Sequence, residues 1–138
     1  MSIEIGRNRV VRQTFGFDDV AIVPGALTID PELVDVRWQL GDLTLPLPIL
    51  GASLDALVDP AFAVALGKLG GLAMMFLEGI YTKYRNPGEV IERIVTAEGE
   101  SVVQLIQEIY RAPVQDELIL QRVSEVKAGG VPCAVAVT

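Results

Sequence analysis

Three short runs of uncharged, mostly apolar residues recur in the later part of the chain, at 48–52, 72–77 and 132–137. Each run has the length of a β-strand, and its apolar character is continuous, which predicts strands buried on both faces. The stretches between the runs carry helical periodicity. An order of strand, helix, strand, helices and strand favours parallel strands joined by helical crossovers, so the sequence predicts an α/β fold.

The first crossover helix is predicted at 60–69. Asp59 suits the N-cap, Pro60 the first helical position, and Gly70-Gly71 the end of the helix. Because these glycines and Gly67 close a helix instead of opening one, they do not form a dinucleotide-binding turn. The face expected to pack on the sheet comprises Phe62, Ala65, Leu66 and Leu69.

Three more helices are expected before the last strand. The first begins at Asn86-Pro87, the second runs from a capping box at Ser101 to Tyr110, and the third extends from Asp116 to Gly129-Gly130. Asp116 is expected to cap the third helix. The buried stripe of that helix is expected to comprise Ile119, Val123 and Val126.

The first part of the chain has a different pattern. Residues 1–14 predict two short strands around a turn at Gly6-Arg7-Asn8, and residues 15–46 are predicted to be irregular except for a brief strand near 36–40. The expected organisation is therefore a lead-in over residues 1–46 and an α/β portion over residues 47–138.

Composition excludes several classes of function. The net charge of −7 argues against nucleic acid as a partner, because binding a phosphate backbone needs a basic surface. The absence of histidine excludes a Ser-His-Asp triad, and one cysteine excludes an internal disulfide and a cysteine metal cluster. No catalytic residue and no metal site is predicted. No apolar run is long enough to span a membrane, the first residues are not expected to form a signal peptide, and a cytoplasmic location is expected.

Three segments are similar to one known family. They are residues 14–25 (TFGFDDVAIVPG), 47–55 (LPILGASLD) and 77–84 (LEGIYTKY). They resemble, in order, the N-terminal signature, the first barrel strand with its Ser-Pro-Met-Asp turn, and the end of the second strand in the IMP dehydrogenase/GMP reductase family. The third segment is closest to the branch that lacks a CBS domain.

This resemblance implies a fold and an activity. The fold would be the first three strands and helices of a (β/α)8 barrel, preceded by an N-terminal β-hairpin and an irregular segment. The family consists of NAD- or NADPH-dependent oxidoreductases of purine nucleotide metabolism that act on IMP or GMP and form homo-oligomers. The family's catalytic cysteine loop and phosphate loops have no counterpart in this sequence, so the chain is expected to be inactive alone. Cys133 lies in a strand context and is expected to be a core residue.

The resemblance also indicates candidate substrate-binding residues. In the family, the Ser and Met of the Ser-Pro-Met-Asp turn touch the nucleotide; here the turn reads Ala52, Ser53, Leu54 and Asp55. The hydroxyl lost at Ala52 removes a hydrogen bond worth about 0.5–1.5 kcal/mol. Glu78, after the second strand, would face the same mouth of the barrel. Alternatively, Asp55 caps backbone amides in a turn and Glu78 is a loop acid.

Three hypotheses follow for the chain as a whole. It is the N-terminal part of a barrel oxidoreductase; or a half-barrel interaction module that pairs its open sheet edge with itself or with a chain carrying the missing half; or a small complete α/β binding protein. The third ranks lowest, because three strands leave too much apolar surface uncovered.

Overall fold

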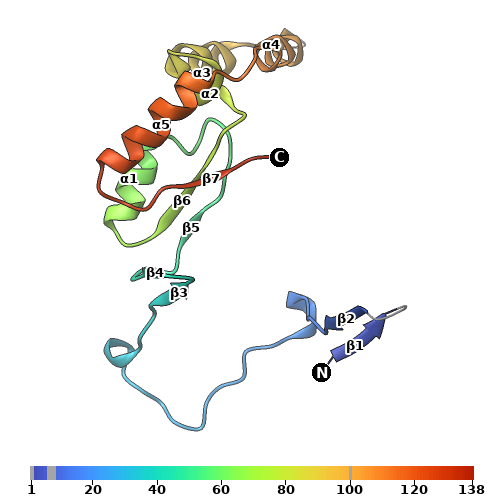
Figure 1. The fold of residues 1–138 in the computed structure, drawn as a ribbon, viewed down its shortest axis with the longest axis vertical. Helices are drawn as coiled ribbons and strands as arrows, with labels where there is room; N and C mark the ends of the chain where they lie inside the picture. Colours follow the sequence, from blue (N-terminus) through green and yellow to red (C-terminus); the bar gives the residue numbers. More distant parts are fainter. Residues whose placement is uncertain (1, 6–8, 100) are drawn as a thin grey trace. The chain divides into compact units, whose positions relative to one another are not determined.

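The computed structural model describes residues 2–5, 9–99 and 101–138 and has a mixed α/β fold (Figure 1). Contacts divide the chain into two compact units, residues 1–34 and residues 35–138. Each is described by itself below. From the sequence, the division is expected after residue 46, where a barrel would start. That division stays a prediction.

The first unit contains the predicted N-terminal hairpin. Strands β1 (Ser2–Ile5) and β2 (Arg9–Arg12) pair in antiparallel fashion, and the predicted turn at residues 6–8 lies outside the described residues. Two single 3-10 turns follow, η1 (Phe17–Asp19) and η2 (Pro31–Leu33). Outside these turns, the described backbone from residue 15 to residue 34 is irregular, as predicted.

The second unit opens with a hairpin that the sequence analysis recognised only in part. Strand β3 (Trp38–Leu40) lies within the predicted segment, whereas its antiparallel partner β4 (Leu43–Leu45) was not predicted. The turn between them contains Gly41, whose φ of +59° is easily adopted by glycine. Leu45 of β4 is 1% exposed. The strand was not predicted because three residues are too few to show an alternating pattern.

A three-stranded parallel sheet lies at the centre of this unit. Strand β6 (Leu72–Phe76) is the middle strand, between β5 (Leu50–Gly51) and β7 (Ala134–Ala136). The predicted parallel order is confirmed. The prediction that all three strands are buried on both faces is wrong: β6 is largely buried, but Leu50 is 42% and Val135 is 44% exposed. The outer strands have a neighbour on one edge alone, which leaves them shorter and more accessible.

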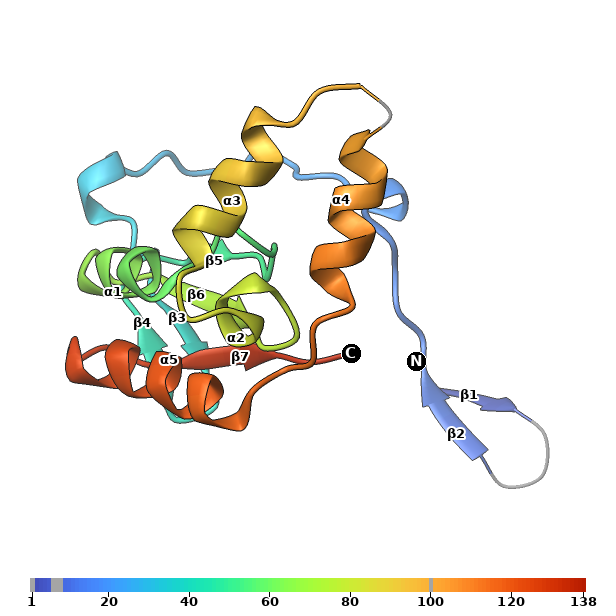
Figure 2. The ribbon, with the colours of Figure 1, turned by 90° about the horizontal axis from the view of Figure 1, so that it is seen from above.

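Two helices cover one face of the sheet. Ala63 of α1 (Pro60–Lys68), Ala73 and Met75 of β6, and Val126 of α5 (Asp116–Ala128) form one buried cluster. Ala73 and Met75 are two residues apart and point to the same side, so both helices pack on that side (Figure 2). Cys133 packs against the same cluster, in agreement with its predicted role as a core residue.

The helix predicted at 60–69 is present, but of its predicted inward face Leu66 is confirmed, whereas Phe62, Ala65 and Leu69 are exposed. Asp59 is the N-cap and accepts a hydrogen bond from the Phe62 amide at 2.6 Å, as expected. Ala63 is buried. The larger side chains therefore do not mark the buried face, because the close approach of α1 to the sheet favours alanine.

The buried stripe of α5 also differs from the prediction. It consists of Leu118, Arg122 and Val126, spaced four residues apart, so Val126 alone of the predicted stripe is fully buried. An arginine was not expected there. The N-cap is Gln115 and not Asp116, which is the first residue of the helix.

Three helices cluster at the far end of the sheet. They are α2 (Ile80–Lys83), which was not predicted, and α3 (Pro87–Thr96) and α4 (Ser101–Tyr110), which were. The three helices lie near one another in Figure 2. Ile80, Val90 and Ile109 contribute one buried residue from each helix to a second core, and Ala56 packs against it. The predicted capping box of α4 involves the side chain of Ser101, which lies outside the described part.

Candidate functional site

The predicted site residues lie at the carboxyl end of the sheet. Residues 52–55 follow β5 directly, and Glu78 lies two residues beyond β6. Because β5 and β6 are parallel, both segments leave the sheet at the same edge. The carboxylate of Asp55 contacts the amide of Ile80, two residues after Glu78, so the two loops meet.

The loop after β5 presents small and apolar side chains. Ala52 and Leu54 are exposed, and Ser53 is half-buried. The loop turns sharply, since the Leu54 amide donates to the Ala52 carbonyl at 2.8 Å and the Val58 amide to the Leu54 carbonyl at 3.2 Å. It can therefore offer a ligand apolar contact and one hydroxyl, but no positive charge.

Asp55 is engaged by donors of the chain itself. Its carboxylate accepts hydrogen bonds from the amide of Ala56 at 2.7 Å, the amide of Ile80 at 3.0 and 3.1 Å, and the hydroxyl of Tyr110 at 2.5 Å. Two of these donors are backbone amides, so the geometry matches the alternative role given in the sequence analysis, in which Asp55 caps backbone amides. Both oxygens are thus occupied by donors from the two loops and from the end of α4.

Two local features accompany this arrangement. Ala56 has a φ of 62°, a strained conformation for alanine, and strain of this kind concentrates at ligand sites and switch regions. Two effects raise the pKa of Tyr110 to about 12: partial burial, which is the larger, and the hydrogen bond to Asp55. The Tyr110 hydroxyl therefore remains a donor to Asp55 at neutral pH.

Glu78 links the loop after β6 to the segment after β7. Its carboxylate accepts hydrogen bonds from the amide of Thr138 at 3.3 Å and from the Thr138 hydroxyl. Asp55 and Glu78 thus connect the ends of neighbouring strands. The sequence analysis identified both carboxylates but neither Tyr110 nor Thr138, because these partners are 55 and 60 positions away and no local pattern marks them.

This edge of the sheet does not suit a phosphate. Helix N-termini bind phosphates through free amides, but here the first turn of α1 is capped by Asp59 and the first amide of α2 by Asp55. Gly70, with a φ of +96°, ends α1, as predicted for the glycine cluster. At these two helix N-termini, carboxylates therefore occupy amides that a phosphate of NAD or NADPH would need.

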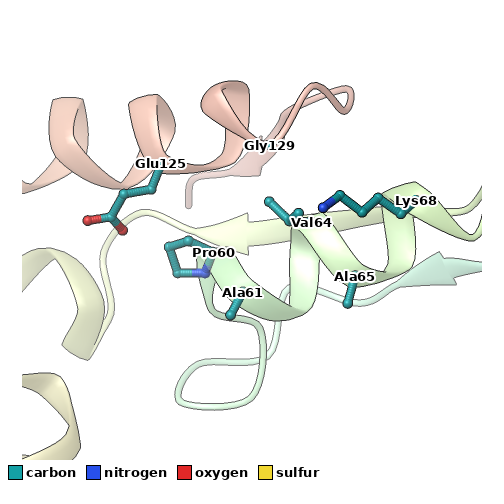
Figure 3. A pocket seen from close by; sticks show the side chains of 7 residues that line it. All are labelled: Pro60, Ala61, Val64, Ala65, Lys68, Glu125 and Gly129. Carbon is teal, nitrogen blue, oxygen red and sulfur yellow. The ribbon is translucent and has the colours of Figure 1, made fainter.

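A separate open groove lies between the two helices that cover the sheet. It has a cavity volume of about 580 Å³ (Figure 3). Its lining includes Pro60, Val64 and Lys68 of α1, Glu125 of α5, and Gly129, which follows α5. It shares no residue with the predicted site. Within the described ranges, no three acidic or cysteine side chains come together as a metal site, and no helix there is long and apolar enough to cross a membrane.

A parallel sheet with loops gathered at its carboxyl end is the arrangement by which α/β proteins bind ligands. A model of the IMP dehydrogenase / GMP reductase domain matches residues 14–131. The chain therefore belongs to the IMP dehydrogenase/GMP reductase family, whose members include oxidoreductases similar to it.

Several relatives support this assignment. An uncharacterized oxidoreductase of Mycolicibacterium smegmatis is 33% identical over 141 residues, which cover 99% of this chain. An inosine-5'-monophosphate dehydrogenase of Methanocaldococcus jannaschii is 38% identical over 64 residues, which cover 46% of this chain and 13% of that protein. The crystal structure of an IMP dehydrogenase/GMP reductase-like protein from Corynebacterium glutamicum superimposes with a TM-score of 0.78 at 29% identity, covering 99% of this chain. This chain spans 38% of the length of the first and third of these proteins.

Proposed function

We propose that this chain forms one wall of the nucleotide pocket of a barrel-type oxidoreductase of purine nucleotide metabolism. In this proposal β5, β6 and β7 are the first three strands of a (β/α)8 barrel, whose substrate sites lie at the carboxyl ends of the strands. The observation that carries it is the meeting of residues 52–55 with the loop after β6 at that edge. The substrate is IMP or GMP.

The candidate residues take different parts in this wall. Ala52 and Leu54 are exposed and supply apolar contact to the purine nucleoside, and Ser53 supplies a hydroxyl. Asp55 and Glu78 border the pocket while their carboxylates hold the loops together. The nucleotide phosphate is held elsewhere, because carboxylates occupy the helix N-termini at this edge.

The chain contributes no catalytic residue in this proposal. Burial raises the pKa of Cys133, which opposes the thiolate form that a nucleophile requires. NAD or NADPH, the cofactor of the family, is bound by residues other than those described. The lone thiol supports a reducing compartment, and we propose a cytoplasmic location.

Nucleotide titrations of the 138-residue chain test this function. Addition of IMP or GMP should shift the amide NMR signals of residues 52–55 and of Glu78, whereas a pyrimidine nucleotide should not. Ser53→Ala should weaken these shifts, and Ser124→Ala, on the exposed side of α5, serves as the matched control. NAD(P)H turnover by the chain alone, or equal shifts with both nucleotide classes, contradicts the proposal.

A second candidate function is assembly through the open sheet edge. Strand β7 is an outer strand, with Val135 44% and Val137 69% exposed, so pairing with a second copy or with the remaining half of a barrel would bury apolar surface. Sedimentation equilibrium should show an oligomer that Val135→Lys dissociates, while Leu120→Lys on exposed α5 does not. A monomer at micromolar concentration contradicts this candidate.

A further inference from the structure

The Asp55 carboxylate joins three segments that are distant in sequence. One oxygen accepts from the Ala56 and Ile80 amides, and the other from the Ile80 amide and the Tyr110 hydroxyl. Ile80 is the first residue of α2, where an amide has no acceptor within the helix. The exchange of these two amides with solvent therefore reports on where the carboxylate lies.

The end of α4 is held in place without the Tyr110 hydroxyl. Ile109 is 1% exposed in the second core, and its carbonyl accepts from the Tyr84 hydroxyl at 2.9 Å. The Lys83 ammonium donates to the carbonyl of Tyr110 at 3.2 Å and to that of Ala112 at 2.7 Å. These contacts anchor the backbone at the end of α4. The Tyr110 hydroxyl can therefore hold the Asp55 carboxylate from a fixed position.

The Asp55 carboxylate is held less firmly by its own segment than the Tyr110 ring is by α4. Asp55 is half-buried in a loop between β5 and α1, and the next residue has a strained backbone. A donor from an anchored helix end therefore restricts the position of the carboxylate more than the carboxylate restricts the helix.

We infer that Tyr110 is a positioning residue whose hydroxyl holds the Asp55 carboxylate on the Ile80 amide and so sets the conformation of the 52–55 loop. The inference rests on the proposed function in taking this loop as the nucleotide-facing wall. It adds to that function a residue from α4, outside both loops, which acts on the pocket through Asp55 and without contact to the ligand.

Amide hydrogen exchange in the full chain at neutral pH tests this inference. Tyr110→Phe should accelerate exchange at Ala56 and Ile80 about two- to tenfold, the range expected for one lost hydrogen bond. Tyr84→Phe is the matched control, because it removes a hydroxyl that donates to the same end of α4 but not to Asp55. It should accelerate exchange at both amides less than Tyr110→Phe does, because Lys83 and the burial of Ile109 still hold the end of α4. Equal effects of the two variants, or none from Tyr110→Phe, overturn the inference.

A spectroscopic measurement covers the case in which Tyr110→Phe folds poorly. The tyrosine ring carbons of the otherwise unaltered chain are titrated with pH by NMR, with and without Asp55→Asn. Loss of the carboxylate should allow Tyr110 to ionise at lower pH than in the unaltered chain. An unchanged Tyr110 titration overturns the inference.

IMP titrations of the same proteins separate this inference from the proposed function. Faster exchange at Ala56 and Ile80 in Tyr110→Phe, with no IMP binding by the unaltered chain, supports the positioning role and removes the proposed function. Binding of IMP by the unaltered chain, with exchange unaffected by Tyr110→Phe, supports the function and overturns the positioning role. If both hold, Tyr110→Phe should weaken IMP binding, and Tyr84→Phe should weaken it less.

Discussion

Gly79 lies against the carboxylate of Asp55 so closely that a Cβ at position 79 would overlap the carboxylate atoms. The backbone of Gly79 is extended, with φ of −98° and ψ of −167°, which any residue adopts. The glycine is therefore required for space and not for backbone freedom. The missing side chain is what allows the loop after β5 to meet the start of α2.

Gly79→Ala should consequently destabilise the chain. We expect a loss of about 1–3 kcal/mol in the free energy of unfolding, as for other overpacked sites, because Asp55 must move off the Ile80 amide. The measurement is urea denaturation followed by circular dichroism. Gly88→Ala, in the first turn of α3, is the control: an added Cβ there meets nothing within 4 Å. Equal midpoints for the two variants would contradict the structure.

Arg122 should stabilise the chain through backbone carbonyls more than through its ion pair. Its guanidinium donates to the carbonyls of Tyr81 at 3.1 Å and Arg85 at 3.3 Å, and it pairs with Glu125 at 3.0 Å. Arg122→Met should lower the free energy of unfolding by about 1–3 kcal/mol, because two part-buried carbonyl acceptors lose their donor. Glu125→Gln, on a half-exposed carboxylate, should cost less than about 1 kcal/mol. The reverse ranking in thermal unfolding would show that the ion pair dominates.

The thiol of Cys133 should react slowly in the folded chain. Burial raises its pKa from 9.0, partly offset by Lys127, so less thiolate is present at any given pH. Alkylation with iodoacetamide should therefore be several-fold slower in buffer than in concentrated urea, with an apparent pKa above 9.0 in buffer. Cys133→Ser supplies the blank, since the chain has one cysteine. Faster alkylation in the folded state would refute the core placement of the thiol.

Tyr110 should make stability depend on alkaline pH. Its pKa is raised from 10.0 to about 12, so the folded state favours the neutral phenol. The resulting contribution to stability is complete below pH 10 and is lost as the pH rises from 10 to about 12. Urea midpoints across this window should fall less for Tyr110→Phe than for the unaltered chain. The loss is modest because the side chain is 40% exposed. Equal slopes for Tyr110→Phe and the unaltered chain would contradict the assignment to Tyr110.

Much of the local structure could be predicted from short-range signals. Asp59 and Pro60 mark the start of α1, and Gly70, with its positive φ, lies just past its end, because caps and breakers act within one helical turn. The three apolar runs became three parallel strands for the same kind of reason. By contrast, α2 has four residues and β4 has three, too few for a periodic pattern.

The buried faces of the helices were harder to predict. In α1 the core side is marked by Ala63 and not by the larger Phe62, and in α5 it includes Arg122. Hydrophobic spacing ranks side chains by size and polarity. It contains no information on the distance between a helix and the sheet. Nor does it show that the carbonyls of Tyr81 and Arg85 accept hydrogen bonds from the Arg122 guanidinium, because both residues lie in another part of the chain.

By itself the sequence determined the α/β order, the family, and Asp55 and Glu78 as the carboxylates at the ends of two strands. These follow from neighbouring residues and from motifs of a few positions. The tertiary structure alone decided what the carboxylates do, because Tyr110 and Thr138 reach them across 55 and 60 positions. A hydrogen bond depends on distance in space, and folding brings together donors and acceptors that no local pattern connects.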